Sequence, residues 1–165
     1  MRKILLSLTI LLAVNVLMAQ QSDIPSVTLK TLDGKNFNTS DIKNGGKPII
    51  LSFWALWCKP CQKELDAFNE LYDEWQEETG VKIVAVSIDD SRSTSRVMPF
   101  VNGKGWEFEV LLDPNGDLKR AMNVNMIPHT FLIDGNGKIV AQHTSYFDGA
   151  ELELYAKVKK LAGIK

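Results

Sequence analysis

The chain contains only two cysteines, Cys58 and Cys61, among its 165 residues. They stand three positions apart, so a bridge between them would close a very small loop. In the chain-entropy model a short loop gains less stability from a disulfide than a long one. A purely structural disulfide is therefore a poor explanation, and the pair is instead typical of a thiol–disulfide redox site.

The chain also lacks internal repeats, low-complexity tracts and a strong charge of either sign. Its formal net charge is −1, so nothing in the composition indicates binding to nucleic acid or to an anionic membrane surface. Hydrophobic residues make up 45% and charged residues 24%, a balance that suits one globular domain with a substantial core. No change of composition divides residues 22–165, which we expect to form one monomeric domain.

The first 19 residues have a different character from the rest of the chain. Arg2 and Lys3 give a basic start, an almost wholly apolar run follows to Met18, and Ala19 is a small residue before a polar stretch. This is the layout of a secretory signal peptide, so we expect residues 1–19 to be cleaved and the domain to be exported to the periplasm. An uncleaved membrane anchor is the alternative, although the run is shorter than the roughly 20 residues of a spanning helix. A lipoprotein anchor is excluded because no cysteine lies near residue 20.

The rest of the sequence alternates between strand and helix patterns in the order ββ-β-α-β-α-β-α-β-β-α. We expect a β-hairpin at 27–37, strands at 49–54, 81–88, 109–113, 130–133 and 138–141, and helices beginning near 61, 96, 117 and 149. Early alternation followed by a late antiparallel hairpin predicts an α/β sheet with a mixed edge.

The two cysteines lie where a buried strand meets an amphipathic helix. The apolar run 49–54 leads into them, and one apolar helical face leads out, made of Leu65, Phe68, Leu71, Tyr72 and Trp75. We expect Trp54 to lie in the core and Trp57 to form an exposed apolar rim that contacts substrates.

Two motifs, Trp57-Cys58-Lys59-Pro60-Cys61 and Ile127-Pro128-His129-Thr130, give the chain a family resemblance. Over nearly all of residues 25–163 it resembles thioredoxin-like proteins, and more narrowly the TlpA-like thiol–disulfide oxidoreductases of the redoxin group. The resemblance implies a thioredoxin-like fold: a central mixed sheet flanked by helices, an N-terminal β-hairpin and an inserted strand-helix segment at 89–106. One departure is Ser52, which stands where thioredoxin has a buried aspartate.

The chemistry of the pair follows from its place at the start of a helix. An exposed Cys58 at the helix N-terminus, beside Lys59, should be the attacking thiolate, because unpaired amides and a nearby cation favour the ionised form. Cys61 lies a turn into the helix and should be the buried, resolving thiol. Pro60 is tolerated in a first helical turn because it lacks only an amide hydrogen that has no helical partner there.

Two further groups complete the predicted site. The resemblance makes Pro128 a cis-proline that faces the disulfide and leaves the backbone of Ile127 free to pair with a substrate chain. On a helical wheel Glu64 falls between Leu71 and Trp75, within the apolar face. A half-buried carboxylate there could move protons to and from Cys61, whereas the simpler interpretation is a first-turn glutamate that complements the helix dipole.

Two other functions would use the same residues. A peroxidase of the peroxiredoxin type would need a threonine where Ala55 stands. A metal carrier could bind copper or zinc through Cys58, Cys61 and His129, but zinc sites usually have four protein ligands. His129 could equally point away from the cysteines, and His143 has the pattern of a surface strand residue. We expect neither a cofactor nor a resident metal.

The sequence leaves the direction of the reaction open between reduction, oxidation and isomerisation. The resemblance favours reduction of disulfides in exported proteins, for example cytochrome c apoproteins before haem attachment. Such a reductase would depend on a membrane electron donor, because its compartment is oxidising.

Overall fold

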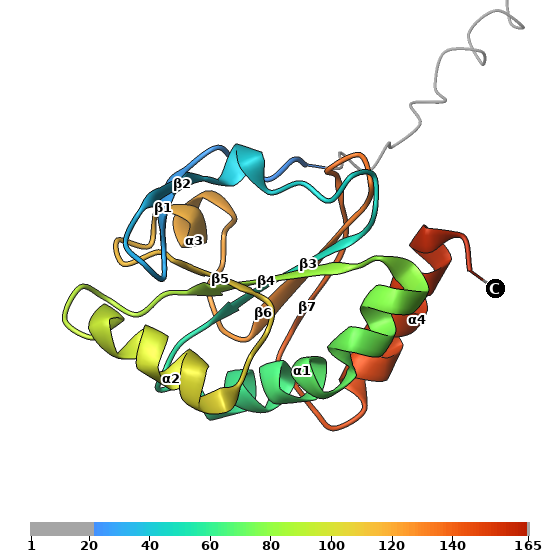
Figure 1. Ribbon diagram of the computed structural model, residues 1–165. Helices are drawn as coiled ribbons and strands as arrows, with labels where there is room; N and C mark the ends of the chain where they lie inside the picture. Colours follow the sequence, from blue (N-terminus) through green and yellow to red (C-terminus); the bar gives the residue numbers. More distant parts are fainter. Residues whose placement is uncertain (1–21, 165) are drawn as a thin grey trace, which may run out of the picture.

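The computed structural model describes residues 22–164, so the predicted signal segment at 1–19 lies outside the described part. A seven-stranded mixed sheet forms the centre of the molecule, in the order β2-β1-β5-β4-β3-β6-β7 (Figure 1). The strands are β1 (Thr28–Thr31), β2 (Asn36–Asn38), β3 (Ile49–Trp54), β4 (Lys82–Ser87), β5 (Glu109–Leu112), β6 (His129–Ile133) and β7 (Ile139–Thr144). The helices are α1 (Lys59–Thr79), α2 (Val97–Lys104), α3 (Asp117–Ala121) and α4 (Ala150–Ala162), with short 3-10 turns η1 (Thr39–Asp41) and η2 (Thr94–Arg96).

The middle of the sheet is parallel and both of its margins are antiparallel. β4 pairs in parallel with β3 on one side and β5 on the other, whereas β6 runs antiparallel to β3, and β7 antiparallel to β6. All six residues of β3 are buried, as expected for an apolar run covered on both faces. The end of β3 and the start of β6 consequently lie side by side, with Phe53 opposite His129.

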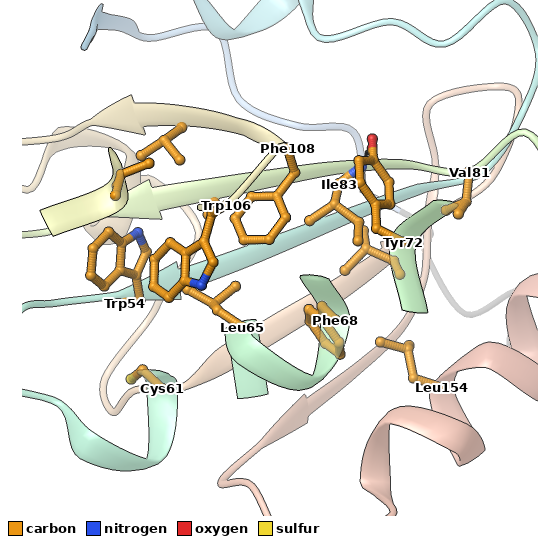
Figure 2. Packing of buried hydrophobic residues seen from close by; sticks show 14 of the residues in the cluster. Trp54, Cys61, Leu65, Phe68, Tyr72, Val81, Ile83, Trp106, Phe108 and Leu154 are labelled. Atoms are coloured by element: carbon orange, nitrogen blue, oxygen red, sulfur yellow. Dashed lines mark hydrogen bonds between the residues drawn. The ribbon is translucent and has the colours of Figure 1, made fainter. Parts of the chain in front are cut away.

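The helices divide between the two faces of the sheet. α1, α2 and α4 cover one face and α3 lies on the other, while the β1–β2 hairpin forms one edge of the sheet (Figure 1). Figure 2 shows the core under α1, where Leu65 lies beside Trp106, and Trp106 packs between Trp54 and Phe108. Successive residues of a strand point to opposite faces, so Leu132 packs in the α1 core and its neighbours Phe131 and Ile133 pack in the α3 core.

The predicted fold class and order of elements are confirmed, but the inserted segment at 89–106 contains the turn η2 and the helix α2 and no strand, because its first residues form turns closed by the Asp90 carbonyl and side chain. Other differences lie at the ends of elements. β7 was expected to end at 141 but continues to Thr144, because β6 offers it a pairing partner along its whole length. α2 passes through Gly103 and ends at Gly105, whose left-handed backbone (φ 66°) suits glycine. Between residues 22 and 164 no helix is both long and apolar enough to cross a membrane.

Candidate active site

The junction of β3 and α1 places the two cysteines at the start of a 21-residue helix. Cys58 is the N-cap, and its Sγ accepts a hydrogen bond from the Cys61 backbone N–H at 3.3 Å. Pro60 stands in the first turn, where its missing N–H costs no helical bond. The two sulfurs are joined in a disulfide. A helix N-terminus with unpaired amides can stabilise a thiolate at Cys58 once the bond is reduced.

Burial of the two sulfurs differs in part from the expectation. Cys61 is fully buried, as expected for a resolving thiol. Cys58 was predicted to be exposed, but only 4% of its surface is accessible to solvent. The reason is that Cys58, in the disulfide, packs into the same core cluster as Trp54, Ala55 and Leu65. Trp57 is the exposed neighbour, with 68% of its surface accessible, and Trp54 is fully buried; both match the prediction.

The loop before Cys58 is held by two side chains that the sequence analysis did not assign to the site. Asp89 Oδ2 accepts a hydrogen bond from the Leu56 N–H at 2.9 Å, and Gln62 Nε2 donates to the Leu56 carbonyl at 2.7 Å. Gln62 is therefore buried, although the helical pattern placed it outside the apolar face. Asp89 follows the buried strand β4. Its position just beyond a strand end is the feature of the sequence that could have indicated that it holds the loop before Cys58.

The Ile127–Pro128 peptide bond is cis, as the resemblance implies. Pro128 immediately precedes β6, so it lies at the edge of the sheet where β3 ends and Cys58 follows. The Pro128 carbonyl accepts a hydrogen bond from the Ser145 N–H at 3.1 Å, which ties this segment to the end of β7. Ile127 is half-buried against both cores, and the preceding Met126 is 58% exposed.

Glu64 is fully buried and lies at the centre of a polar cluster. Its Oε2 accepts hydrogen bonds from Ser52 Oγ and Thr130 Oγ1, each at 2.9 Å, and its Oε1 lies 2.8 Å from His143 Nε2. The carboxylate thus occupies the space beside Ser52 where the resemblance places an aspartate. Since Glu64 is one helical turn beyond Cys61, the two side chains lie on neighbouring positions of the same helix face. A dipole-complementing surface glutamate does not fit this burial.

The two histidines of the chain lie on opposite faces of the sheet. His143 was expected at the surface, but the extension of β7 makes it the register partner of Thr130 and brings its ring to Glu64. His129 lies on the other face of the sheet, stacked on Phe131 at 4.3 Å between ring centroids, with Nε2 2.9 Å from Gln142 Oε1. It does not approach the cysteines, so the three metal ligands considered above are not brought together.

The arrangement supports two-electron thiol–disulfide exchange. It supplies a cysteine at a helix N-terminus, a buried second cysteine at bonding distance and a buried carboxylate one turn away. It also supplies an exposed tryptophan beside the sulfurs, against which another protein can pack.

Comparisons with known proteins agree with this chemistry. A family model described as AhpC/TSA family matches residues 21–142. A thiol-disulfide oxidoreductase ResA of Bacillus thuringiensis (strain Al Hakam) is 38% identical over 133 residues, which cover 81% of this chain and 74% of the relative.

Two solved structures extend the likeness to the fold. An uncharacterized thioredoxin-like protein from Porphyromonas gingivalis is 54% identical, with a TM-score of 0.76 over 85% of this chain and 92% of that one. A putative thiol:disulfide interchange protein DsbE from Chlorobium tepidum is 30% identical, with a TM-score of 0.76 over 87% of this chain and 97% of that one. The chain therefore belongs to the AhpC/TSA family, as a thioredoxin-like thiol–disulfide oxidoreductase of the ResA-like kind.

Proposed function

We propose that the protein reduces disulfide bonds of exported proteins, with Cys58 as the attacking thiolate and Cys61 as the resolving thiol. The observation that carries this proposal is the buried Glu64 carboxylate, hydrogen-bonded by Ser52 and Thr130, one helical turn from Cys61. A buried resolving thiol needs a nearby proton acceptor before it can attack, and the burial of Glu64 one turn from Cys61 supports this role for it.

The reaction proceeds in two exchanges. The Cys58 thiolate attacks one sulfur of the substrate disulfide, so that a mixed disulfide forms and one substrate thiolate leaves. Cys61 then gives its proton to Glu64 and attacks Cys58 Sγ, which forms the Cys58–Cys61 disulfide and releases the second substrate thiolate. The two electrons of the dithiol end in two substrate thiols. An external dithiol, reduced by a membrane electron donor, restores the protein.

Three residues around the sulfurs would hold the substrate chain. Trp57 offers an exposed apolar surface beside Cys58. Ile127, ahead of the cis Pro128, would pair its backbone with an extended substrate segment in the manner of an added strand. We include cytochrome c apoproteins before haem attachment among the substrates, and we propose that residues 1–19 are a cleaved signal peptide that directs residues 22–165 to the periplasm.

The decisive measurement is the equilibrium redox potential of Cys58–Cys61 against dithiothreitol and glutathione. We expect a value close to about −270 mV, at the reducing end of the range for such pairs, together with reduction of insulin disulfides that is lost in Cys58→Ser. A potential near about −120 mV would instead identify an oxidant and overturn the proposed direction. Rapid consumption of hydrogen peroxide by the reduced protein would indicate a peroxidase.

A further inference from the structure

The geometry points to His143 as the group through which the buried Glu64 exchanges its proton with water, which makes it a positioning and relay residue for the step at Cys61. This inference rests on the proposed function and adds a residue to its mechanism. His143 stands far from the cysteine motif in sequence, on the edge strand β7.

Access to solvent separates His143 from the other partners of Glu64. Ser52 and Thr130 are fully buried, as is Glu64 itself. The His143 side chain is 28% exposed, and its Nε2 lies 2.8 Å from Glu64 Oε1. Of the side chains that hydrogen-bond Glu64 in the described residues, His143 alone reaches water. A proton that arrives on Glu64 therefore has one side-chain route out of the core.

The chemistry of the partners also assigns different tasks to them. The hydroxyls of Ser52 and Thr130 each donate to Oε2, but they offer no titratable group through which a proton could leave. An imidazole can donate from Nε2 to the carboxylate or accept from the protonated acid at the same atom. The 2.8 Å contact at Oε1 is thus the one at which a proton can pass in either direction.

Glu64 is the ionisable side chain that contacts His143 in the part of the chain that the structure describes. Glu64 faces it from α1, and β6 presents the uncharged Thr130 as its register partner. Just after β7, burial raises the pKa of Tyr146, and the hydrogen bond to Glu151 of α4 and the charge of Glu64 act in the same direction. Beside Tyr146, Lys63 and Asp148 line a surface hollow of about 440 Å³ with opposite charges. Glu64 is therefore the acid that His143 contacts directly.

The proposed step carries one proton from Cys61 to water. While Cys61 attacks the mixed disulfide, its S–H bond breaks and the proton moves to Glu64. The protonated carboxyl group passes a proton from Oε1 to His143 Nε2, and the imidazolium loses one from Nδ1 to water. Glu64 is again a carboxylate, and His143 is again neutral but carries its proton on Nε2. Proton exchange with water returns the ring to the Nδ1–H tautomer before the next cycle, and no electrons move through the two residues.

The test separates the two exchanges with a stoichiometric amount of an aromatic bis(nitrobenzoate) disulfide, which releases one coloured thiolate at each exchange. The first release reports attack by Cys58 and the second reports closure by Cys61, as Cys61→Ser should show by giving only the first. In His143→Gln, whose amide can still donate to Glu64 but cannot relay a proton, we expect an unchanged first release. Near pH 6–7 the second should be slower by about tenfold or more, within the range that loss of a positioned acid–base group produces.

Two comparisons distinguish a relay from a structural role. Added imidazole should speed the second release in His143→Ala, because the partly exposed site can admit the small base. His129→Gln is the matched control, since His129 is the other histidine of the chain and lies on the opposite face of the sheet. Both releases should keep the wild-type rate in this variant. Equal slowing of both releases in His143→Gln, a wild-type second release at every pH, or no response to imidazole would each overturn the inference.

The outcome does not depend on the proposed substrate class. If the wild-type protein left insulin disulfides intact but closed the mixed disulfide with the small reagent, the proposed function would fail. The inference would still be decided by the second release.

Discussion

Thr130→Val should destabilise the oxidised protein by about 1.5–3 kcal/mol, the cost of losing a buried hydrogen bond to a charged group. Valine has nearly the shape of threonine, so the packing of β6 changes little and the loss falls on the hydroxyl. That hydroxyl lies 2.9 Å from both Glu64 Oε2 and Ser52 Oγ, in a fully buried position. Without it, the carboxylate keeps only Ser52 and His143 as partners.

The same reasoning makes an opposite prediction for the carboxylate itself. Glu64→Leu removes the buried charge and leaves Ser52 and Thr130 free to bond each other, as their 2.9 Å separation allows. Replacement of buried ionic groups by apolar residues of similar volume is often neutral or stabilising by about 1–4 kcal/mol. We therefore expect Glu64→Leu to be at least as stable as wild type while its closing step at Cys61 is slow.

Urea unfolding at pH 7, followed by circular dichroism with the disulfide intact, measures both effects. A double-mutant cycle supplies the decisive comparison, because Thr130→Val should cost much less when Glu64 is already leucine. If Thr130→Val costs the same in both backgrounds, or if Glu64→Leu is the less stable single variant, the account of Glu64 as a buried charge held by hydroxyl donors is wrong.

Three other predictions concern the wider structure. A Cβ on Gly135 would lie 2.0 Å from the Gly46 carbonyl oxygen, so Gly135→Ala should lower the unfolding free energy by about 1–3 kcal/mol. Gly103 lies on α2 with open space around it, so Gly103→Ala should raise the unfolding free energy by about 0.5–1 kcal/mol. Trp57→Ala should leave the melting temperature unchanged and raise KM about tenfold for protein disulfides but not for small ones, because the exposed ring contacts only large substrates. Burial is the largest of the causes that raise the pKa of the three tyrosines, Tyr72, Tyr146 and Tyr155, above 10.0. The stability that goes with these raised pKa values is complete below pH 10 and is lost as the pH rises through the pKa values of the folded protein. In an alkaline titration, the tyrosinate absorbance should therefore develop together with unfolding.

Much of the site could be predicted because its residues are close together in the sequence. The apolar run of β3, the cysteine spacing and the helical face of α1 all belong to one segment, and helical periodicity put Glu64 within the apolar face. The cis Pro128 followed from resemblance to a motif and not from local physics, because most X–Pro bonds are trans.

The hydrogen-bond partners of Glu64 could not be predicted from the sequence in this way. Their contacts depend on the pairing of β6 with β3 and β7 and on which face each residue then presents. A shift of one residue in that register would turn Thr130 and His143 to the opposite face and bring His129 toward the helix. Composition and periodicity do not specify this register.

The sequence by itself thus determined the order of elements, the redox pair at the β3–α1 junction and the place of Glu64 within the apolar face of the helix. These features depend on local spacing and on the hydrophobic pattern. Only the tertiary structure decided how the carboxylate is satisfied and how it reaches solvent, because Ser52, Thr130 and His143 come from three strands that meet across the sheet. It also decided that Cys58 is covered, since its neighbours in the core come from both sides of the junction.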